Sequence, residues 1–564
     1  MSSSEISNST GSDVSPQRAL LLSILLWAAM YLPGLGAVQL QHEEPRRALP
    51  GLHMLTSGDW LVPRVGSEPY LRKPPLLNWA IALSCKLAGG VSEWAVRLPS
   101  VLATLVLAIA IVGIAGHRWL GYQGGLIAAV FFLTNFTMIE TGRLAELEAL
   151  YIALTGIAVI LWMTSWRSDA GRWQLWLFPA PFLALGMLTK GPTHLVFYYG
   201  IVLPVLFLGN DTRSLLHPAH FISLIIIVGA PLCWAIPCSL AVSSHDPTSV
   251  WNFWWGQLAS RASAESDEHF RLGVWLLNGP QTLKNYLPWT LLLPLLWRKE
   301  TVTAITTASE SVPREIALFR GARWGMLSTA ILMVLLPNGS PRYIYPVIVV
   351  PCLLLGRALT AQHGAAIPTW IEPAWSRVNL VLLALVTAGV AAAPFFGRRN
   401  QFVWACLETA FAASAWAFAL SRKGCSADLD SGSTSQLGSQ VVLSGAVAAI
   451  GVMIFTTAAM PQVDSANKLR PREIARLLRS AMPAGTTLWV MERSYQPFWY
   501  YLEPNVRYFH KISELPAGVR YILVPATQTS PSLNDQVWRG NPPKIMMRVV
   551  DNEKNAFDLL VSSQ

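Results

Sequence analysis

The sequence predicts an all-α polytopic membrane protein that carries a small C-terminal α/β domain outside the membrane. Hydrophobic residues make up 52% of the 564 residues and charged residues only 13%, whereas a soluble chain averages about 25% charged residues. Apolar runs close to the ~20 residues that cross a bilayer recur along the chain. A change of composition after Pro461 predicts the separate domain.

The apolar runs predict a transmembrane domain over residues 1–460 with about thirteen helices. The polar start of the chain lacks a charged segment followed by a short apolar stretch and a small-residue cleavage site, so we interpret the first run as a retained span. Two long polar loops, 41–97 and 243–285, interrupt the pattern. The predicted spans are 19–40, 98–116, 123–139, 146–165, 174–189, 192–209, 220–242, 286–297, 324–337, 341–361, 377–397, 400–420 and 439–460.

Residues 461–564 predict a small α/β domain. "PREIARLLRSAM" has the spacing of an amphipathic helix, "TTLWVM" and "RYILVP" read as buried strands, and "YQPFWYYLE" as a short helix between them. The change from long apolar runs to short alternating elements places this domain outside the membrane.

The net charge of +10 resides in loops between spans, which favours anionic lipids or phosphates as partners and argues against nucleic acid. The six cysteines are scattered, with no CxxC pair, so the sequence predicts neither a zinc finger nor a disulfide framework.

Counting spans assigns the loops to two faces. If the N-terminus lies on one side, the other side receives 41–97, the turn at 140–146, "LTKGP", 243–285, "NGSPRY" and the C-terminal domain. Lysine and arginine are spread about evenly over both faces, so the positive-inside rule does not orient the chain.

Ionisable residues gather on that second face, and such residues at span ends are functional candidates. Each of these residues also has a simpler, structural interpretation. The first acids fit a solvated helix start, Lys73 fits an interfacial anchor before Pro74-Pro75, and the later acids fit a surface charge cluster with Arg143. These residues come from distant loops but fall on one face, and this convergence favours the functional interpretation. The set comprises Glu43, Glu44, Arg46, Arg47, Arg72, Lys73, Glu140, Glu146, Glu148, Lys190, Arg342 and Tyr343.

Several motifs occur in a fixed order: an acidic pair followed by arginine after the first span, then "SGDWLVP", "YLRKPPL", "GRLAELE", "LTKGP" and "SPRYIYP". In this combination, residues 19–365 resemble the membrane glycosyltransferases of the GT-C type. The similar branch contains the aminoarabinose transferase of lipid A and the dolichyl-phosphate-mannose protein mannosyltransferases. The resemblance implies a bacterial inner (plasma) membrane protein whose second face is the periplasm.

Enzymes of this family take a sugar from a polyprenyl-phosphate carrier. The resemblance implies that Glu43, with Glu44 beside it, sits at the reaction centre, supported by Glu148 or, alternatively, Glu146. Mg²⁺ or Mn²⁺ could bind such acids, although the sequence requires no metal and no cofactor. The implied phosphate-binding residues are Lys73, Arg72, Arg46, Lys190, Arg342 and Tyr343.

Two departures from the family concern the first loop. The family usually has aspartate where this chain has Glu43, and Pro45 and Pro50 interrupt a helix that is normally regular. Pro45 fits a first helical turn, whereas Pro50 is expected to break or kink the helix. The acceptor therefore stays open among a lipid A-like glycolipid, another envelope glycan and a protein hydroxyl.

The sequence thus predicts a glycosyltransferase that acts on a lipid-phosphate-linked sugar, with membrane lipids around it. The alternative is a transporter or flippase of polyprenyl-linked lipids, which also needs many spans and phosphate-binding cations. Two features argue against it: the chain shows no clear inverted repeats, and its charge gathers at one face instead of the midplane.

Overall fold

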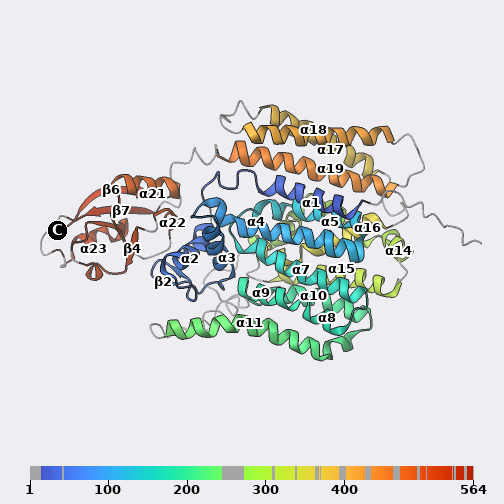
Figure 1. Cartoon of the computed structure of the whole chain (residues 1–564), viewed down its shortest axis with the longest axis horizontal. Helices are drawn as coiled ribbons and strands as arrows, with labels where there is room; N and C mark the ends of the chain where they lie inside the picture. Colours follow the sequence, from blue (N-terminus) through green and yellow to red (C-terminus); the bar gives the residue numbers. More distant parts are fainter. Residues whose placement is uncertain are drawn as a thin grey trace, which may run out of the picture.

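The computed structural model shows a helical bundle with a small mixed domain at one end (Figure 1). Residues 244–271 of the predicted loop 243–285 lie outside the described residues. The structure describes residues 14–40, 43–243, 272–307, 312–336, 340–361, 368, 370–392, 402–425, 433–461, 470–491, 496–502, 505–516, 518–535, 538, 542–551 and 555–562.

Helix dominates the bundle, as the apolar runs predict. Its α-helices are α1 (Pro16–Tyr31), α4 (Glu93–Ala110), α5 (Gly121–Thr134), α6 (Phe136–Thr141), α7 (Leu147–Arg167), α8 (Arg172–Leu177), α9 (Ala180–Lys190), α10 (Thr193–Leu208), α11 (Pro218–Ser243), α13 (Leu272–Lys284), α14 (Lys299–Thr307), α15 (Val312–Leu335), α16 (Val349–Thr360), α17 (Ile371–Ala392), α18 (Phe402–Cys425) and α19 (Ser433–Ile454).

The predicted count of thirteen spans is not confirmed. Within the described residues, six helices are long and apolar enough to cross a membrane, or seven if the pair Pro341–Val347 and Val349–Thr360, bent by 52°, is one span. The apolar runs overestimate span length because the chain breaks inside them. The first run ends as a helix at Tyr31, the run 174–189 divides into α8 and α9, and 286–297 forms a 3₁₀-helix over Trp289–Trp297.

A glycine turn lies within the long helical stretch that starts at α4. After α4 the chain continues as a π-helix over Ile111–Leu120 and then turns at Gly121, where φ is 71° and ψ is 159°. Helix α5 packs back against the π-helix, and a Cβ on Gly125 would lie 3.0 Å from the Cα of Gly116. Glycine at both positions permits this backbone approach, so the predicted spans 98–116 and 123–139 appear as two packed helices.

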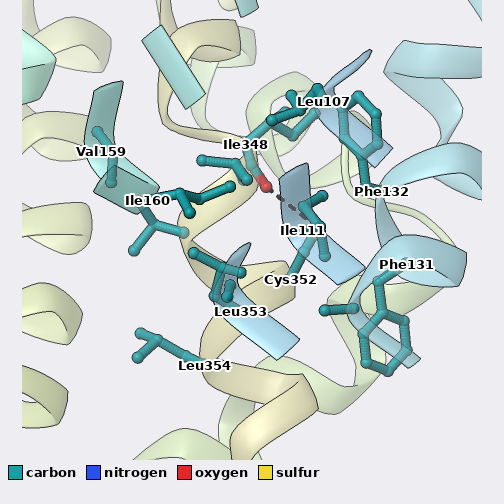
Figure 2. Packing of buried hydrophobic residues seen from close by; sticks show 14 of the residues in the cluster. Leu107, Ile111, Phe131, Phe132, Val159, Ile160, Ile348, Cys352, Leu353 and Leu354 are labelled. Carbon is teal, nitrogen blue, oxygen red and sulfur yellow. Dashed lines mark hydrogen bonds between the residues drawn. The ribbon is translucent and has the colours of Figure 1, made fainter. Parts of the chain in front are cut away.

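The centre of the bundle is apolar. Leu107 and Ile111 meet Phe131 and Phe132 of α5, all at most 1% exposed, and α7 and α16 close the cluster (Figure 2). The thiol of Cys352 donates to the carbonyl of Ile348 across 3.2 Å, so this cysteine behaves as a small core residue.

One buried carboxylate links four helices at the end of the bundle away from the C-terminal domain. Glu315 of α15 is fully buried and pairs with Arg167 of α7 and, at 2.8 Å, with Arg357 of α16. The indole of Trp119 in the π-helix donates to the same carboxylate at 2.9 Å. These contacts hold the carboxylate in a fully satisfied network.

The segment after α1 forms a compact unit between the bundle and the C-terminal domain (Figure 1). It contains α2 (Glu44–Ser57), a two-stranded antiparallel ribbon of β1 (Arg64–Val65) and β2 (Glu68–Pro69), and α3 (Leu76–Leu87). Pro45 lies in the first turn of α2, as predicted, but Pro50 lies inside the helix, which continues to Ser57. Of the expected break or kink at Pro50, the break is wrong, because the helix is continuous and Pro50 lies buried within it.

The C-terminal elements follow the prediction. Helix α21 (Pro471–Ser480) comes first, and α22 (Trp499–Leu502) lies between two strands. The sheet has the order β4-β3-β5-β7-β6, with β3 parallel to β4 and β5, and β7 antiparallel to β5 and β6. Its strands are β3 (Leu488–Met491), β4 (Val506–Phe509), β5 (Tyr521–Pro525), β6 (Lys544–Val550) and β7 (Ala556–Val561). Short helix α23 (Thr529–Leu533) completes the unit.

This sheet domain packs directly on the α2–α3 unit. Leu49 and Leu52 of α2 share one buried apolar cluster with Ile474 of α21. The backbone N–H of Leu40 donates to the hydroxyl of Tyr501 at 2.7 Å, and Arg472 forms an ion pair with Glu93. The loop 41–97 and the C-terminal domain therefore lie on the same face of the bundle.

Candidate active site

The first group of the site lies at the start of α2. Glu43 is the residue before the helix, and its side chain is 42% exposed. Its carboxylate accepts from Arg46 at 2.9 Å and from Arg47 at 3.3 Å. The spacing of three and four residues puts both arginines over the same carboxylate on one helix face. Glu43 is therefore an exposed acid held between two cations.

Glu44, one residue later, has a different environment. It is fully buried, and both oxygens pair with the guanidinium of Arg97 at 2.8 Å. The backbone N–H of Ala145 donates to the same carboxylate at 2.8 Å, while Arg97 also donates to the carbonyls of Leu35 and Val38. Glu44 thus presents no accessible oxygen to a substrate, and its predicted place at the reaction centre gives way to a role in fixing α2.

The second pair of acids lies at the start of α7. Glu146 precedes the helix and is buried, and its carboxylate lies 3.8 Å from the guanidinium of Arg342. Burial and the neighbouring charge of Glu148 raise the pKa of Glu146 to about 7. The side chain of Arg342 is 55% exposed, so it combines contact with a buried acid and access from outside.

Glu148 pairs with Lys190. The ammonium lies 2.9 Å from the carboxylate, with side chains that are 17% and 11% exposed. Lys190 is the last residue of α9, and Gly191 follows it with φ at 84°, a left-handed backbone that favours glycine. The predicted motif "LTKGP" therefore places its lysine against the second acid. The ring centre of Tyr151 lies 5.7 Å from the same ammonium.

Arg47 and Tyr70 connect the two groups; Arg47 was predicted only as a candidate without a role, and Tyr70 was not predicted. The guanidinium of Arg47 donates to the Tyr70 hydroxyl, and its charge acts on both Glu146 and Glu148. The side chain is only 11% exposed, and its Nε has no hydrogen-bond partner among the described residues. A double arginine beside the acidic pair, and a tyrosine at the start of "YLRKPPL", were the available signals.

The other predicted phosphate-binding residues lie in two further segments. Arg72 is exposed and Lys73 is half-buried in the turn before α3, and the charge of Arg72 reaches Tyr70. Tyr343 is half-buried beside Arg342 in the 3₁₀-helix Pro341–Val347.

Arg143, which the simpler interpretation pairs with Glu146 and Glu148, faces elsewhere. It donates to the backbone carbonyls of Met30, at 3.0 Å, and of Pro33, so it closes the end of α1. The acids of α7 therefore form their ion pairs with Arg342 and Lys190, which come from other segments. Glu146 and Glu148 do not form a surface charge cluster with Arg143.

The donor set does not favour a resident divalent cation. No group of three or more His, Cys, Asp and Glu side chains comes together in the part of the chain that the structure describes. Glu146 and Glu148 would supply carboxylate oxygens, but each already has a cationic neighbour. Cationic side chains occupy the positions where a metal would compensate the acids.

The chain is similar to known proteins in both sequence and fold. The family of dolichyl-phosphate-mannose-protein mannosyltransferases matches residues 72–234. An undecaprenyl phosphate-alpha-4-amino-4-deoxy-L-arabinose arabinosyl transferase of Edwardsiella ictaluri is 25% identical over 67% of each chain. One of Serratia proteamaculans is 26% identical over 67% of this chain and 66% of its own.

The fold extends the match to the whole chain. The crystal structure of ArnT from Cupriavidus metallidurans bound to undecaprenyl phosphate has a TM-score of 0.65, covering 98% of this chain and 99% of that one at 18% identity. The chain has the fold of that protein and is similar in sequence to the two arabinosyl transferases. The family match covers Lys73, Glu146, Glu148 and Lys190, which come from three separate segments.

Proposed function

We propose that the protein is a membrane glycosyltransferase that moves a sugar from a polyprenyl-phosphate carrier to a glycolipid acceptor at the periplasmic face of the bacterial inner membrane. The observation that carries the proposal is that Arg47, 3.3 Å from the carboxylate of Glu43, also acts electrostatically on Glu146, the partner of Arg342, and so links the two acid–cation groups. The curated relatives act on an undecaprenyl-phosphate-linked aminoarabinose by name, which supports this class of donor.

The cations of the site would serve the leaving phosphate. Transfer breaks the bond between the anomeric carbon and a phosphate oxygen, and the negative charge on the departing lipid phosphate grows as that bond breaks. Lys73 in the turn before α3 and the exposed Arg342 are the residues we assign to that charge. Fixed cations at a developing charge stabilise the transition state because they need no reorganisation.

The acids would serve the acceptor. An acceptor hydroxyl forms the new bond to the anomeric carbon and loses a proton, whereas an acceptor phosphate is already ionised. Glu146 is suited to take that proton because its pKa of about 7 is near the operating pH, where a general base is most effective. Glu43, held by Arg46 and Arg47, would orient the acceptor. Glu148, bound to Lys190, would position that lysine.

Turnover in detergent tests the proposal. The full-length protein is purified, supplied with an undecaprenyl-phosphate-linked aminosugar and a phosphorylated diglucosamine lipid, and its products are identified by mass spectrometry. A transferase forms the glycosylated acceptor and free undecaprenyl phosphate in equal amounts without two compartments. A transporter or flippase leaves both lipids unchanged, and that result would replace the proposed function with the alternative.

A further inference from the structure

Two arginines of α15, Arg320 and Arg323, form a group separate from the acid–cation site, here called the arginine pair. They lie in the half of α15 that begins at the end of the bundle away from the sheet domain (Figure 1). Positions three residues apart are neighbours on a helix, and the charge of Arg320 acts on Arg323. Arg320 is exposed, whereas Arg323 is only 9% exposed. The pair therefore joins a buried cation to one at the surface.

Arg323 is a buried charge whose hydrogen bonding is incomplete. One of its terminal nitrogens donates to the carbonyl of Leu296 at 2.7 Å, where the 3₁₀-helix Trp289–Trp297 ends. Its Nε has no hydrogen-bond partner among the described residues, although a guanidinium has five N–H donors. A buried charge is costly unless it is paired and hydrogen-bonded, so an anion beside Arg323 would stabilise it.

The acids of the surrounding helices do not supply that anion in the part of the chain that the structure describes. The 3₁₀-helix contains no acid, and α14 and α15 contribute Glu300 and Glu315. Glu300 pairs with Arg298 at 3.3 Å, and Glu315 pairs with Arg167 and Arg357. The repulsion within the arginine pair is therefore uncompensated. Arginine forks match phosphate oxygens in a bidentate manner, so phosphate is the anion that fits the pair.

Two tryptophans flank the arginine pair. The guanidinium carbon of Arg323 lies 5.5 Å from the ring centre of Trp297 and 5.7 Å from that of Trp324. These contacts stabilise the cation through the ring faces but supply no negative ion. Both tryptophans are exposed at the outside of the bundle, and exposed tryptophan is typical of the boundary between membrane and water. The rings thus place the pair at the level of lipid head groups.

An apolar stripe runs along α15 from the arginine pair. Trp324, Ile331 and Leu335 lie on one face of the helix because positions four and seven residues apart coincide, and all three are exposed. From the first to the last of them the helix rises about 16 Å, which is about half of the ~30 Å hydrocarbon core of a bilayer. The stripe matches the length of a lipid tail, whereas a free phosphate would leave it uncovered.

We propose that the arginine pair binds the phosphate of one anionic phospholipid, whose tail lies along the stripe from Trp324 to Leu335. The phosphate lies between Arg320 and Arg323 and supplies the missing counter-charge. The proposed orientation puts this end of the bundle in the cytoplasmic leaflet, where basic pockets between spans bind anionic head groups. Binding needs neither sugar donor nor acceptor, so its test is independent of the proposed function.

Native mass spectrometry tests the site on the full-length protein in detergent. The protein is delipidated and titrated with phosphatidylglycerol, or with zwitterionic phosphatidylcholine that has the same acyl chains. We expect one phosphatidylglycerol to bind about tenfold more tightly than phosphatidylcholine, since hydrogen bonds between charged groups are the stronger ones. The double variant Arg320→Gln/Arg323→Gln should bind phosphatidylglycerol no more tightly than phosphatidylcholine.

The matched control is Arg118→Gln. Arg118 is an exposed arginine at the same end of the bundle, next to Trp119, which donates to Glu315. This variant should bind phosphatidylglycerol like the wild type. Arg320→Gln changes only the exposed member of the pair and should also weaken binding, so it decides the case if the double variant unfolds.

Three outcomes overturn the site: equal affinity of the wild type for both lipids, unchanged phosphatidylglycerol affinity in the double variant, or equal weakening by Arg118→Gln. Inorganic phosphate that displaces phosphatidylglycerol at equal concentration would assign the pair to a free anion and overturn the lipid assignment.

Melting temperatures give a second readout. A ligand that binds the folded state stabilises it by mass action, so phosphatidylglycerol should raise the melting temperature of the wild type more than phosphatidylcholine does. This difference should disappear in the double variant and remain in Arg118→Gln. An equal rise with both lipids in the wild type, or an undiminished difference in the double variant, would contradict a head-group site at the arginine pair.

Discussion

At the scale of residues, neighbouring acids of the same motif occupy contrasting environments. Glu43 is exposed between two arginines, whereas Glu44 is buried against Arg97. Glu146 has a raised pKa next to an exposed arginine, whereas Glu148 is bound to a lysine at 2.9 Å. Pairs of carboxyl groups whose surroundings differ in this way commonly divide the tasks of a reaction between them.

Lys73 offers a direct test of phosphate stabilisation. We expect Lys73→Ala to lower kcat by about 10²–10³, the usual scale for losing one donor to a developing charge. Lys86→Ala is the matched control, since Lys86 is an exposed lysine in the last turn of α3. Transfer is measured with a labelled donor. Full activity in a folded Lys73→Ala protein would return this residue to a membrane anchor.

Glu146 should determine the pH dependence of the reaction if the acceptor is a hydroxyl. Only the ionised carboxylate can take a proton, so kcat/KM should fall about tenfold per pH unit below its pKa of about 7 and level off above it. Glu146→Gln should lower the rate by ~10² or more and remove this dependence. The same acidic limb in the variant would assign the titration to another group.

At the scale of elements, α2 is fixed by a buried ion pair. Removing one partner leaves the other charge buried, which typically costs about 3–5 kcal/mol. We therefore expect Glu44→Gln to lower the melting temperature of the detergent-purified protein. Glu43→Gln is the control: its carboxylate is 42% exposed, so the effect on stability should stay below about 1 kcal/mol.

The opposite pattern would restore Glu44 to the reaction centre. In that case Glu44→Gln melts with the wild type but loses transfer, while Glu43→Gln remains active. Measuring both quantities on both variants separates an anchoring residue from a catalytic one.

The elements also show how much of the structure can be predicted from the sequence. Apolar periodicity predicts the helical bundle and each element of the terminal domain that it names, because these signals are local. Span number is not predicted, since breaks such as the one after Tyr31 depend on packing. The residue types of the site come from motifs, but the burial of Glu44 depends on Arg97, which lies in another helix, 53 positions away. Arg47 was a candidate without a role and Tyr70 was missed, because the contact between them is tertiary.

At the scale of the whole molecule, the active-site cluster and the sheet domain share one face. A membrane-impermeant maleimide can test which face this is. Gly90 lies in the turn before α4 and Gly171 in the turn between α7 and α8, and a Cβ at either meets nothing within 4 Å. We expect Gly90→Cys to be labelled in spheroplasts and Gly171→Cys only after permeabilisation, with wild type as the blank. The reverse pattern would invert the proposed orientation.

The packing of the C-terminal domain on α2 has a consequence for biosynthesis. Leu52 leaves the ribosome 422 residues before Ile474, its partner in the buried cluster. At roughly 5–20 residues per second, the first loop waits about 20–80 s for the surface that covers it. During that interval the side of the first loop that Ile474 covers is still open to water, so we expect the yield of folded protein to depend on translation speed as well as on final stability.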